Sequence, residues 1–183
     1  MPRYAAFLRA INVGGHVVKM DRLRTLFEEM NLSNVKTVIA SGNVLFDSPL
    51  KNSAALERKI ERQLHMSLGY GVATFLRTAA EMERIAAYEP FPAAVMKQPY
   101  HALFVSFLGA DLAPAAQRAV LALGSADDVI HVHGHELYWL RRKSFTESPI
   151  SMAVVERALG MPVTARNVTT VRKIAAACSA GAK

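Results

Sequence analysis

The sequence contains the run Thr74-Phe-Leu-Arg-Thr78 and, 89 residues later, the similar run Val163-Thr-Ala-Arg-Asn167. Each run is strand-like and leads into a helical stretch in which Ile85 and Ile174 hold equivalent places. The spacing between strand and helix is the same in both copies. This correspondence predicts that one structural unit occurs twice along the chain.

The element order around the two runs follows from hydrophobic spacing. In the first half we predict strands at 4–9, 35–40, 44–46 and 72–77, and helices at 20–30, at 53–68 and after Thr78. In the second half we predict strands at 101–108, 129–132, 136–140 and 163–166, and helices at 114–123, 151–159 and 168–178. The predicted fold class is therefore α+β, with two tandem ferredoxin-like repeats, each βαββαβ plus a helix, and mostly antiparallel sheets.

Three prolines, Pro90, Pro92 and Pro99, interrupt the pattern between the halves. Proline is a strong punctuation signal, so we place the boundary there. The expected domains are residues 1–90 and residues 91–183, packed together as one unit. A chain of 183 residues can bury a sizeable core without disulfides.

The composition predicts a cytoplasmic protein. Cys178 is the only cysteine, so an intrachain disulfide is impossible. The N-terminal residues lack the pattern of a signal peptide, and no apolar run approaches the roughly 20 residues that a membrane helix needs. We therefore expect no membrane association.

The net charge of +7 is concentrated near the C-terminus. From Arg141 onward there are eight basic residues and two acidic ones, Glu147 and Glu156. Such asymmetry is typical of a protein with an anionic partner, and one hypothesis is nucleic-acid binding through this basic quarter. The alternative is a solvated basic face that maintains solubility.

A candidate ligand site lies in the first half. In a ferredoxin-like unit, the loop after the first strand and the turn between the second and third strands lie at the same end of the sheet. The residues brought together there are Arg9, Asn12, Gly14, Gly15, His16, Lys19, Ser41, Gly42 and Asn43. Helix-start amides flanked by cations predict a site for a small phosphate- or carboxylate-bearing ligand. Alternatively, the glycines only turn the chain and Asn43 only holds the hairpin.

A second basic cluster is predicted where the last two strands of the second half end. It comprises Arg141, Arg142, Lys143, Arg166 and Asn167. Arginine pairs suit phosphate or carboxylate recognition. Alternatively, Arg166 caps a helix or forms a structural ion pair with Glu147.

Three histidines, His131, His133 and His135, alternate along a predicted strand and turn. Imidazoles at this spacing can bind zinc or nickel, but no carboxylate or cysteine accompanies them in the motif. We therefore predict a polar strand end rather than a metal site. No motif for a nucleotide cofactor or a catalytic nucleophile is present, so neither a cofactor nor a reaction is assigned.

RNA recognition through an open sheet face is disfavoured. The third strand of an RNA-recognition fold carries stacking aromatic residues in a basic pattern, whereas residues 42–47 hold one aromatic and no basic residue. A third hypothesis is an assembly role, in which sheet faces or edges pair in a homodimer.

Three stretches resemble the bacterial family catalogued as domain of unknown function 1697. They are Phe7-Leu-Arg-Ala-Ile-Asn-Val-Gly-Gly15, Ile39-Ala-Ser-Gly-Asn-Val-Leu-Phe46 and Thr164-Ala-Arg-Asn-Val-Thr-Thr-Val171. In the third stretch, Val168 stands where the family usually carries a tryptophan. The resemblance spans nearly the whole chain and implies two ferredoxin-like repeats. It implies no activity.

Overall fold

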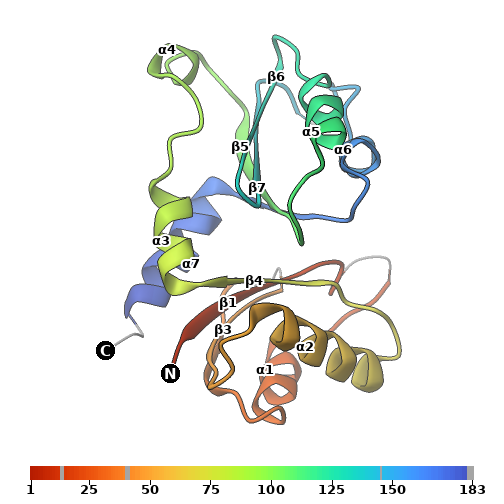
Figure 1. Cartoon of the computed structure of the whole chain (residues 1–183), viewed down its shortest axis with the longest axis vertical. Helices are drawn as coiled ribbons and strands as arrows, with labels where there is room; N and C mark the ends of the chain where they lie inside the picture. Colours follow the sequence, from red (N-terminus) through yellow and green to blue (C-terminus); the bar gives the residue numbers. More distant parts are fainter. Residues whose placement is uncertain (13–14, 40–41, 145, 181–183) are drawn as a thin grey trace. The chain divides into compact units, whose positions relative to one another are not determined.

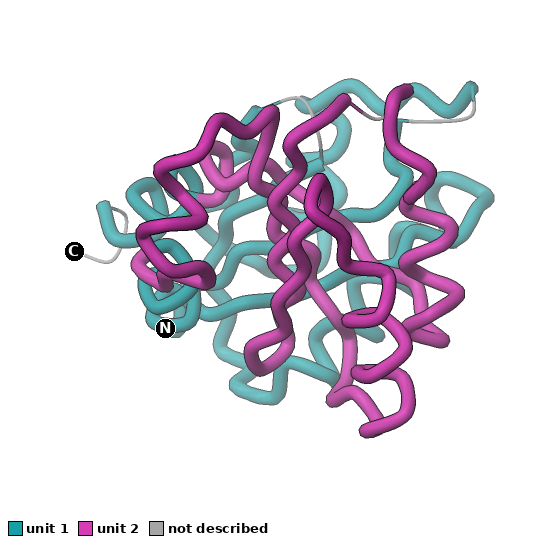
Figure 2. Tube along the Cα trace, turned by 90° about the horizontal axis from the view of Figure 1, so that it is seen from above, with its two compact units in different colours: residues 1–86, 172–183 teal, residues 87–171 magenta. Residues whose placement is uncertain are grey.

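The computed structural model describes residues 1–12, 15–39, 42–144 and 146–180. The chain divides into two compact units, which Figure 2 shows in different colours. The first contains Met1–Ala86 together with the C-terminal residues from Arg172, and the second contains Ala87–Val171. The predicted division at residue 90 therefore differs for the C-terminal helix, which belongs to the first unit from Arg172 onward.

The first unit contains a four-stranded sheet with all neighbouring strands antiparallel. Its strands are β1 (Arg3–Leu8), β2 (Ser33–Thr37), β3 (Asn43–Asp47) and β4 (Thr74–Thr78), in the spatial order β2-β3-β1-β4. Two helices, α1 (Met20–Glu28) and α2 (Ser53–Leu68), connect β1 to β2 and β3 to β4. The element order is thus β-α-β-β-α-β, as the sequence predicts.

Alternation along β1 explains how the first sheet is buried on both faces. Tyr4, Ala6 and Leu8 pack with α1 and α2 in one hydrophobic core, where Leu23 and Ile60 are fully buried. The intervening residues of β1 point to the opposite face and are buried as well. A strand buried on both faces reads as a continuous apolar run, which is why β1 is easy to find in the sequence.

Helix α7 (Val168–Ala180) covers part of that opposite face, and α3 (Ala79–Ala87) lies beside it in Figure 1. The Ser179 hydroxyl donates to a Glu83 carboxylate oxygen at 2.6 Å and joins the two helices. Cys178 is fully buried, and burial raises the pKa of its thiol to about 11. The thiol therefore serves as a small buried apolar group.

A capping box formed by Thr78 and Glu81 begins α3. The Glu81 carboxylate accepts the Thr78 amide at 2.7 Å and the Thr78 hydroxyl at 2.8 Å. The Thr78 hydroxyl in turn accepts the Glu81 amide at 3.3 Å. Burial alone would raise the pKa of Glu81, but these hydrogen bonds lower it below its ordinary value.

Carboxylates from α2 satisfy the outer backbone groups of the edge strand β4. Glu61 accepts the Thr74 amide and Glu57 accepts the Leu76 amide, both at 2.9 Å. Burial raises the pKa of Glu57, and the Leu76 hydrogen bond opposes that shift. Because an open strand edge is a template for pairing with another chain, these carboxylates protect the edge.

The second unit has the same order of elements. Its strands are β5 (Ala102–Phe107), β6 (Asp128–His133), β7 (Glu136–Arg141) and β8 (Thr164–Asn167), arranged β6-β7-β5-β8 with antiparallel neighbours. Helices α5 (Pro114–Leu121) and α6 (Met152–Leu159) pack on one face, around Leu137 and Trp139. A short helix, α4 (Ala93–Met96), lies within the proline-rich segment that the sequence predicts only as a boundary.

The largest boundary error concerns β2. We predict a strand at 35–40, but β2 ends at Thr37 and Ile39 adopts a left-handed φ of 58°. The Val38 amide still donates to the Asn43 carbonyl at 2.9 Å and closes the hairpin. The chain turns at Ile39, so the apolar run in the sequence extends beyond the end of the strand at Thr37.

Candidate functional site

Two loops of the first unit meet at one end of its sheet. The Leu8 amide donates to the Gly42 carbonyl at 2.8 Å. Gly42 has a φ of +73°, and a Cβ placed on it would lie 2.5 Å from Cγ2 of Ile11. Only glycine fits this approach, because any side chain would overlap Ile11. The loop after β1 and the turn before β3 are therefore in direct contact.

The backbone of both loops is strained. Ala10 has a φ of 61° and Ile39 has a φ of 58°. Both residues are exposed, so burial of their side chains does not force this conformation. A non-glycine residue in the left-handed region costs on the order of 1–3 kcal/mol, and a β-branched residue there is a genuine outlier. Strain on two adjoining loops is a recognised mark of functional sites.

Two predicted ligand contacts have structural roles in this structure. Oδ1 of Asn12 accepts the Val18 amide at 2.6 Å. Nδ2 of Asn43 donates to the Val38 carbonyl at 3.0 Å, and Asn43 is fully buried. These side-chain amides shape the two loops. For Asn43 this agrees with the alternative that it holds the hairpin.

The remaining predicted residues leave a smaller group of cations at this loop end. Arg9 is half-buried, whereas Gly15 and Lys19 are exposed. Lys19 holds the N-cap position of α1, and no described side chain caps that helix start. Gly14 and Ser41 lie outside the described residues. The described candidate site is therefore Arg9, Gly15 and Lys19, together with His16.

The sequence misses the partner of His16. Its imidazole stacks on Tyr70 with ring centroids 3.8 Å apart, and the Tyr70 hydroxyl donates to the Ile11 carbonyl at 3.1 Å. Tyr70 thus ties the loop between α2 and β4 to the loop after β1. Its only sequence signal is an aromatic residue between two glycines at a helix end. The stacked rings of His16 and Tyr70 lie on the loop after β1.

The structure corrects the second basic cluster, because Arg141 and Arg166 do not converge. Arg141 pairs with Ala102 on β5, whereas Arg166 pairs with Val105. Partners an odd number of residues apart on one strand place their neighbours on opposite faces of the sheet. The prediction from strand ends ignores this alternation.

The cations of the second cluster also have partners within the second unit. Arg142 donates to the carbonyls of Ala126, Pro99 and Val95 at 3.1, 2.9 and 3.5 Å. Lys143 forms an ion pair with Asp127 at 2.6 Å. Arg142 therefore holds the segment before β5 in place.

At the other end of that cluster, Arg166 donates to the Thr164 hydroxyl at 2.8 Å and to the Ala165 carbonyl at 2.9 Å. Burial lowers the pKa of Arg166 to about 10. Asn167 accepts the amide and the hydroxyl of Thr169, so it caps the start of α7. The structure thus gives Asn167, not Arg166, the capping role.

The three histidines do not converge on one point. The Tyr88 hydroxyl lies 2.8 Å from Nε2 of His131. The Tyr88 ring stacks on the His133 ring, with the ring centroids 4.2 Å apart. His135 instead contacts Asp111 at 2.8 Å across a different loop. Among the described residues, no group of three or more histidine, cysteine or acidic side chains is arranged to bind a metal ion.

The partly buried His131 should make the stability of the protein depend on pH. Burial, followed by the charge of His133, lowers the pKa of His131 below 6.5. The unfolded chain therefore binds the proton more readily, so stability is full above about pH 6.5 and declines as pH falls from there toward the lower folded pKa. We expect the free energy of unfolding to decrease between pH 7 and pH 5, and a His131→Gln variant to lose part of that slope. An unchanged slope in urea titrations of that variant would contradict the assignment.

The described parts of the chain define a mixed α+β protein with two four-stranded antiparallel sheets. A family described as "Protein of unknown function (DUF1697)" matches residues 1–138, and the chain belongs to this family. Among solved structures, it resembles conserved bacterial protein SP0830 from Streptococcus pneumoniae, with a TM-score of 0.77 and 24% identity over 98% of this chain and 99% of that one. At this identity the likeness concerns the fold alone.

The comparison with curated proteins gives no match. None of the helices in the described residues combines the length and the apolar character that crossing a membrane requires.

Proposed function

We propose that the first unit binds a small anionic molecule, bearing phosphate or carboxylate, at the loop end formed by Arg9–Lys19 and the turn at Gly42. The observation that carries this proposal is the left-handed backbone of Ala10 and Ile39 on two loops that touch. Such strain persists only where the surrounding structure imposes it, and it concentrates at ligand sites. The proposal excludes Asn12 and Asn43 as direct ligand contacts.

The charge of this loop end supports an anion. Lys19 lies at the uncapped start of α1, whose free amides and dipole favour negative charge, and Arg9 directly follows β1. Asp21 in the first turn opposes this, but its carboxylate lies 3.6 Å from Arg24. The stacked rings of His16 and Tyr70 offer a flat surface for an apolar or aromatic part of the ligand.

Substitution of the two cations tests the proposal. With inorganic pyrophosphate as the probe, we expect Lys19→Gln to weaken binding several-fold and Arg9→Gln by about 10- to 100-fold, the usual worth of a charge-assisted hydrogen bond. The matched control is Lys36→Gln, an exposed cation on β2 of the same unit. Isothermal titration supplies the affinities, and thermal unfolding verifies that each variant is folded. Equal losses in Lys19→Gln and Lys36→Gln would contradict the site.

We also propose that both units are ferredoxin-like repeats, arisen by tandem duplication. The shared orders β2-β3-β1-β4 and β6-β7-β5-β8 and the antiparallel pairing support this. So does the equivalence of Arg77 and Arg166, each of which donates to the carbonyl of its preceding residue. A cytoplasmic location remains our proposal on the ground of the single, buried cysteine.

Nucleic-acid binding through the C-terminal quarter is a weaker second proposal. Arg142, Lys143 and Arg166 have intramolecular partners, so fewer charges are available to phosphates. The homodimer hypothesis has a specific counter-observation at one edge, since Glu57 and Glu61 occupy the amides of β4. The anion site at the first loop end therefore has the best support.

A further inference from the structure

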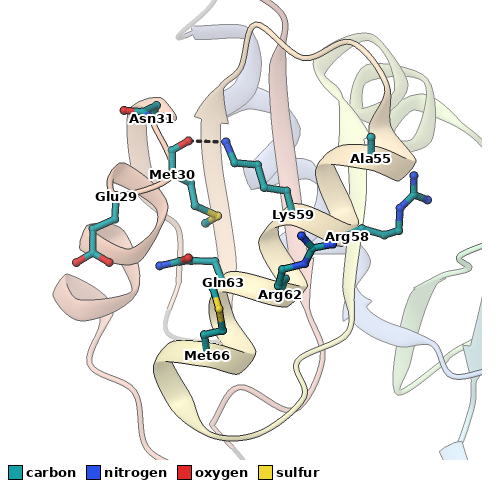
Figure 3. Close-up of a pocket in the computed structure, with 9 residues that line it drawn as sticks. All are labelled: Glu29, Met30, Asn31, Ala55, Arg58, Lys59, Arg62, Gln63 and Met66. Carbon is teal, nitrogen blue, oxygen red and sulfur yellow. Dashed lines mark hydrogen bonds between the residues drawn. The ribbon is translucent and has the colours of Figure 1, made fainter.

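A groove of about 360 Å³ lies on the helical side of the first unit, away from the loop-end site. One wall is the end of α1, at Glu29 and Met30, and the other is the outer face of α2. Figure 3 shows three cations along α2, Arg58, Lys59 and Arg62, in the wall of this groove. The groove is therefore strongly basic on one side.

Lys59 has a structural role in this groove. Its Nζ donates to the Met30 carbonyl at 2.7 Å, which is drawn as a dashed line in Figure 3. The last carbonyls of a helix carry partial negative charge and lack intrahelical donors, so Lys59 stabilises the end of α1. This bond also fixes the separation of the two walls.

The acidic side chain that lines the groove, Glu29, pairs with an arginine that does not line it. Glu29 is the one acidic side chain among the described residues that line the groove. Its carboxylate lies 3.3 Å from the guanidinium of Arg22 on α1. The neighbouring Glu57 on α2 accepts the Leu76 amide at 2.9 Å, on the sheet side of the helix. Burial raises the pKa of Glu57 and the charge of Arg58 partly opposes that shift, but in the described part of the chain neither carboxylate forms a salt bridge with Arg58 or Arg62.

Arg58 and Arg62 are exposed, and no described residue forms an ion pair with either. They are four residues apart on one helix, so their side chains neighbour each other on the same face. Two adjacent guanidinium groups can hold the oxygens of one carboxylate or phosphate in parallel hydrogen bonds. The i, i+4 spacing would allow these two exposed side chains to reach a single anionic head group.

Apolar side chains complete the groove. Met30 is buried in its wall, whereas Met66 lies one turn beyond Arg62 and is 67% exposed. Methionine is flexible and polarizable, and it is favoured where a surface must adapt to an apolar ligand. The groove thus combines an anion-binding pair with an apolar patch at the C-terminal end of α2.

We propose that this groove binds an amphipathic anion, with a carboxylate or phosphate head group on Arg58 and Arg62 and an apolar tail against Met66. This site is independent of the proposed loop-end site, because the two share no residue. Head-group chemistry is common to an acyl carboxylate and an alkyl phosphate, so both are needed as probes.

Titrations of the full-length protein with octanoate and with octyl phosphate test this inference. We expect the double variant Arg58→Gln/Arg62→Gln to lower the affinity for both probes at least 10-fold. Met66→Gln should lower the affinity for octanoate but not that for acetate. Arg84→Gln, an exposed cation on α3 of the same unit, is the matched control and should bind as the unsubstituted protein does. All these residues are exposed, so the variants should fold.

Equal affinity of the double variant and the control variant for the probes would overturn the inference. It would also be overturned if neither octanoate nor octyl phosphate bound the unsubstituted protein. Binding that is lost in Lys19→Gln and kept in Arg58→Gln/Arg62→Gln would also overturn it, while supporting the loop-end site. Loss of both probes in the double variant, with pyrophosphate binding unchanged, would support both sites. Preference for one probe identifies the head group.

Discussion

Replacing Asp128 with alanine is expected to lower the free energy of unfolding by about 3–5 kcal/mol, because it leaves a buried arginine without its counter-charge. Asp128 is 2% exposed and Arg141 is fully buried. Oδ1 of Asp128 accepts the Trp139 indole N–H at 2.8 Å and lies 3.4 Å from Nε of Arg141. Oδ2 accepts the Ser148 hydroxyl at 2.7 Å. One carboxylate thus accepts two hydrogen bonds and supplies the counter-charge of a buried guanidinium.

The energetics of this cluster are dominated by burial. Burial lowers the pKa of Arg141, and the charge of Asp128 opposes that shift. The guanidinium carbon also lies 4.4 Å from the Trp139 ring centroid, a cation–π contact. Without the carboxylate, the guanidinium would stay desolvated beside an apolar ring, and the Trp139 and Ser148 donors would lose their acceptor.

Urea unfolding followed by tryptophan fluorescence measures this effect, since Trp139 is the only tryptophan in the chain and reports on the second unit. The matched control is Asp127→Ala, which removes an ion pair with Lys143 at the surface and should cost far less than Asp128→Ala, because solvent screens exposed pairs. If Asp128→Ala does not fold, Asp128→Asn, which keeps an acceptor oxygen, should show an intermediate loss. Similar losses for Asp127→Ala and Asp128→Ala would contradict the interpretation of the cluster.

Replacing Gly42 with alanine is expected to cost about 2–4 kcal/mol. A left-handed conformation alone costs an L-residue roughly 1–2 kcal/mol. The added Cβ would also lie 2.5 Å from Cγ2 of Ile11 and 3.3 Å from Cβ of Leu8, and relieving such overlap typically costs about 1–3 kcal/mol. The methyl group would therefore push apart the two loops of the candidate site.

Gly69→Ala separates these two contributions. Gly69 has a φ of +80°, and a Cβ placed on it would meet nothing within 4 Å. It should therefore show the conformational cost alone. We further expect Ile11→Ala to offset part of the loss caused by Gly42→Ala, because it removes the overlapping atom. Urea unfolding followed by circular dichroism gives these values, and equal losses for the two glycine variants would contradict the close approach.

Most of the fold can be predicted from local sequence patterns. Strands such as β1 are apolar throughout because both faces are buried, and the hairpin at Gly42 and the capping box at Thr78 depend on residues only a few positions apart. The placement of α7 cannot be read this way. Its assignment to the first unit depends on contacts such as Ser179 with Glu83, which are 96 residues apart.

The candidate site is only partly predictable for a related reason. Topology correctly brings the loop at Arg9 to the turn at Gly42, because it follows from strand order. Sequence does not reveal that Asn12 and Asn43 are occupied by backbone groups, nor that Arg141 and Arg166 lie on opposite faces. Strand register determines the latter, and a shift of one residue reverses every side chain. The groove beside Arg58 and Arg62 depends on how two helices pack, which no local pattern records.

Amide chemical shifts of ¹⁵N-labelled protein, recorded during titration with inorganic pyrophosphate, test the central proposal most directly. We predict saturable shifts at residues 9–12, 15–19 and 42, with little change along the second unit. Lys19→Gln should raise the dissociation constant obtained from these shifts, and Lys36→Gln should leave it unchanged. Absence of saturable shifts at these residues, or shifts of the same size spread over all exposed cations, would contradict an anion site at this loop end.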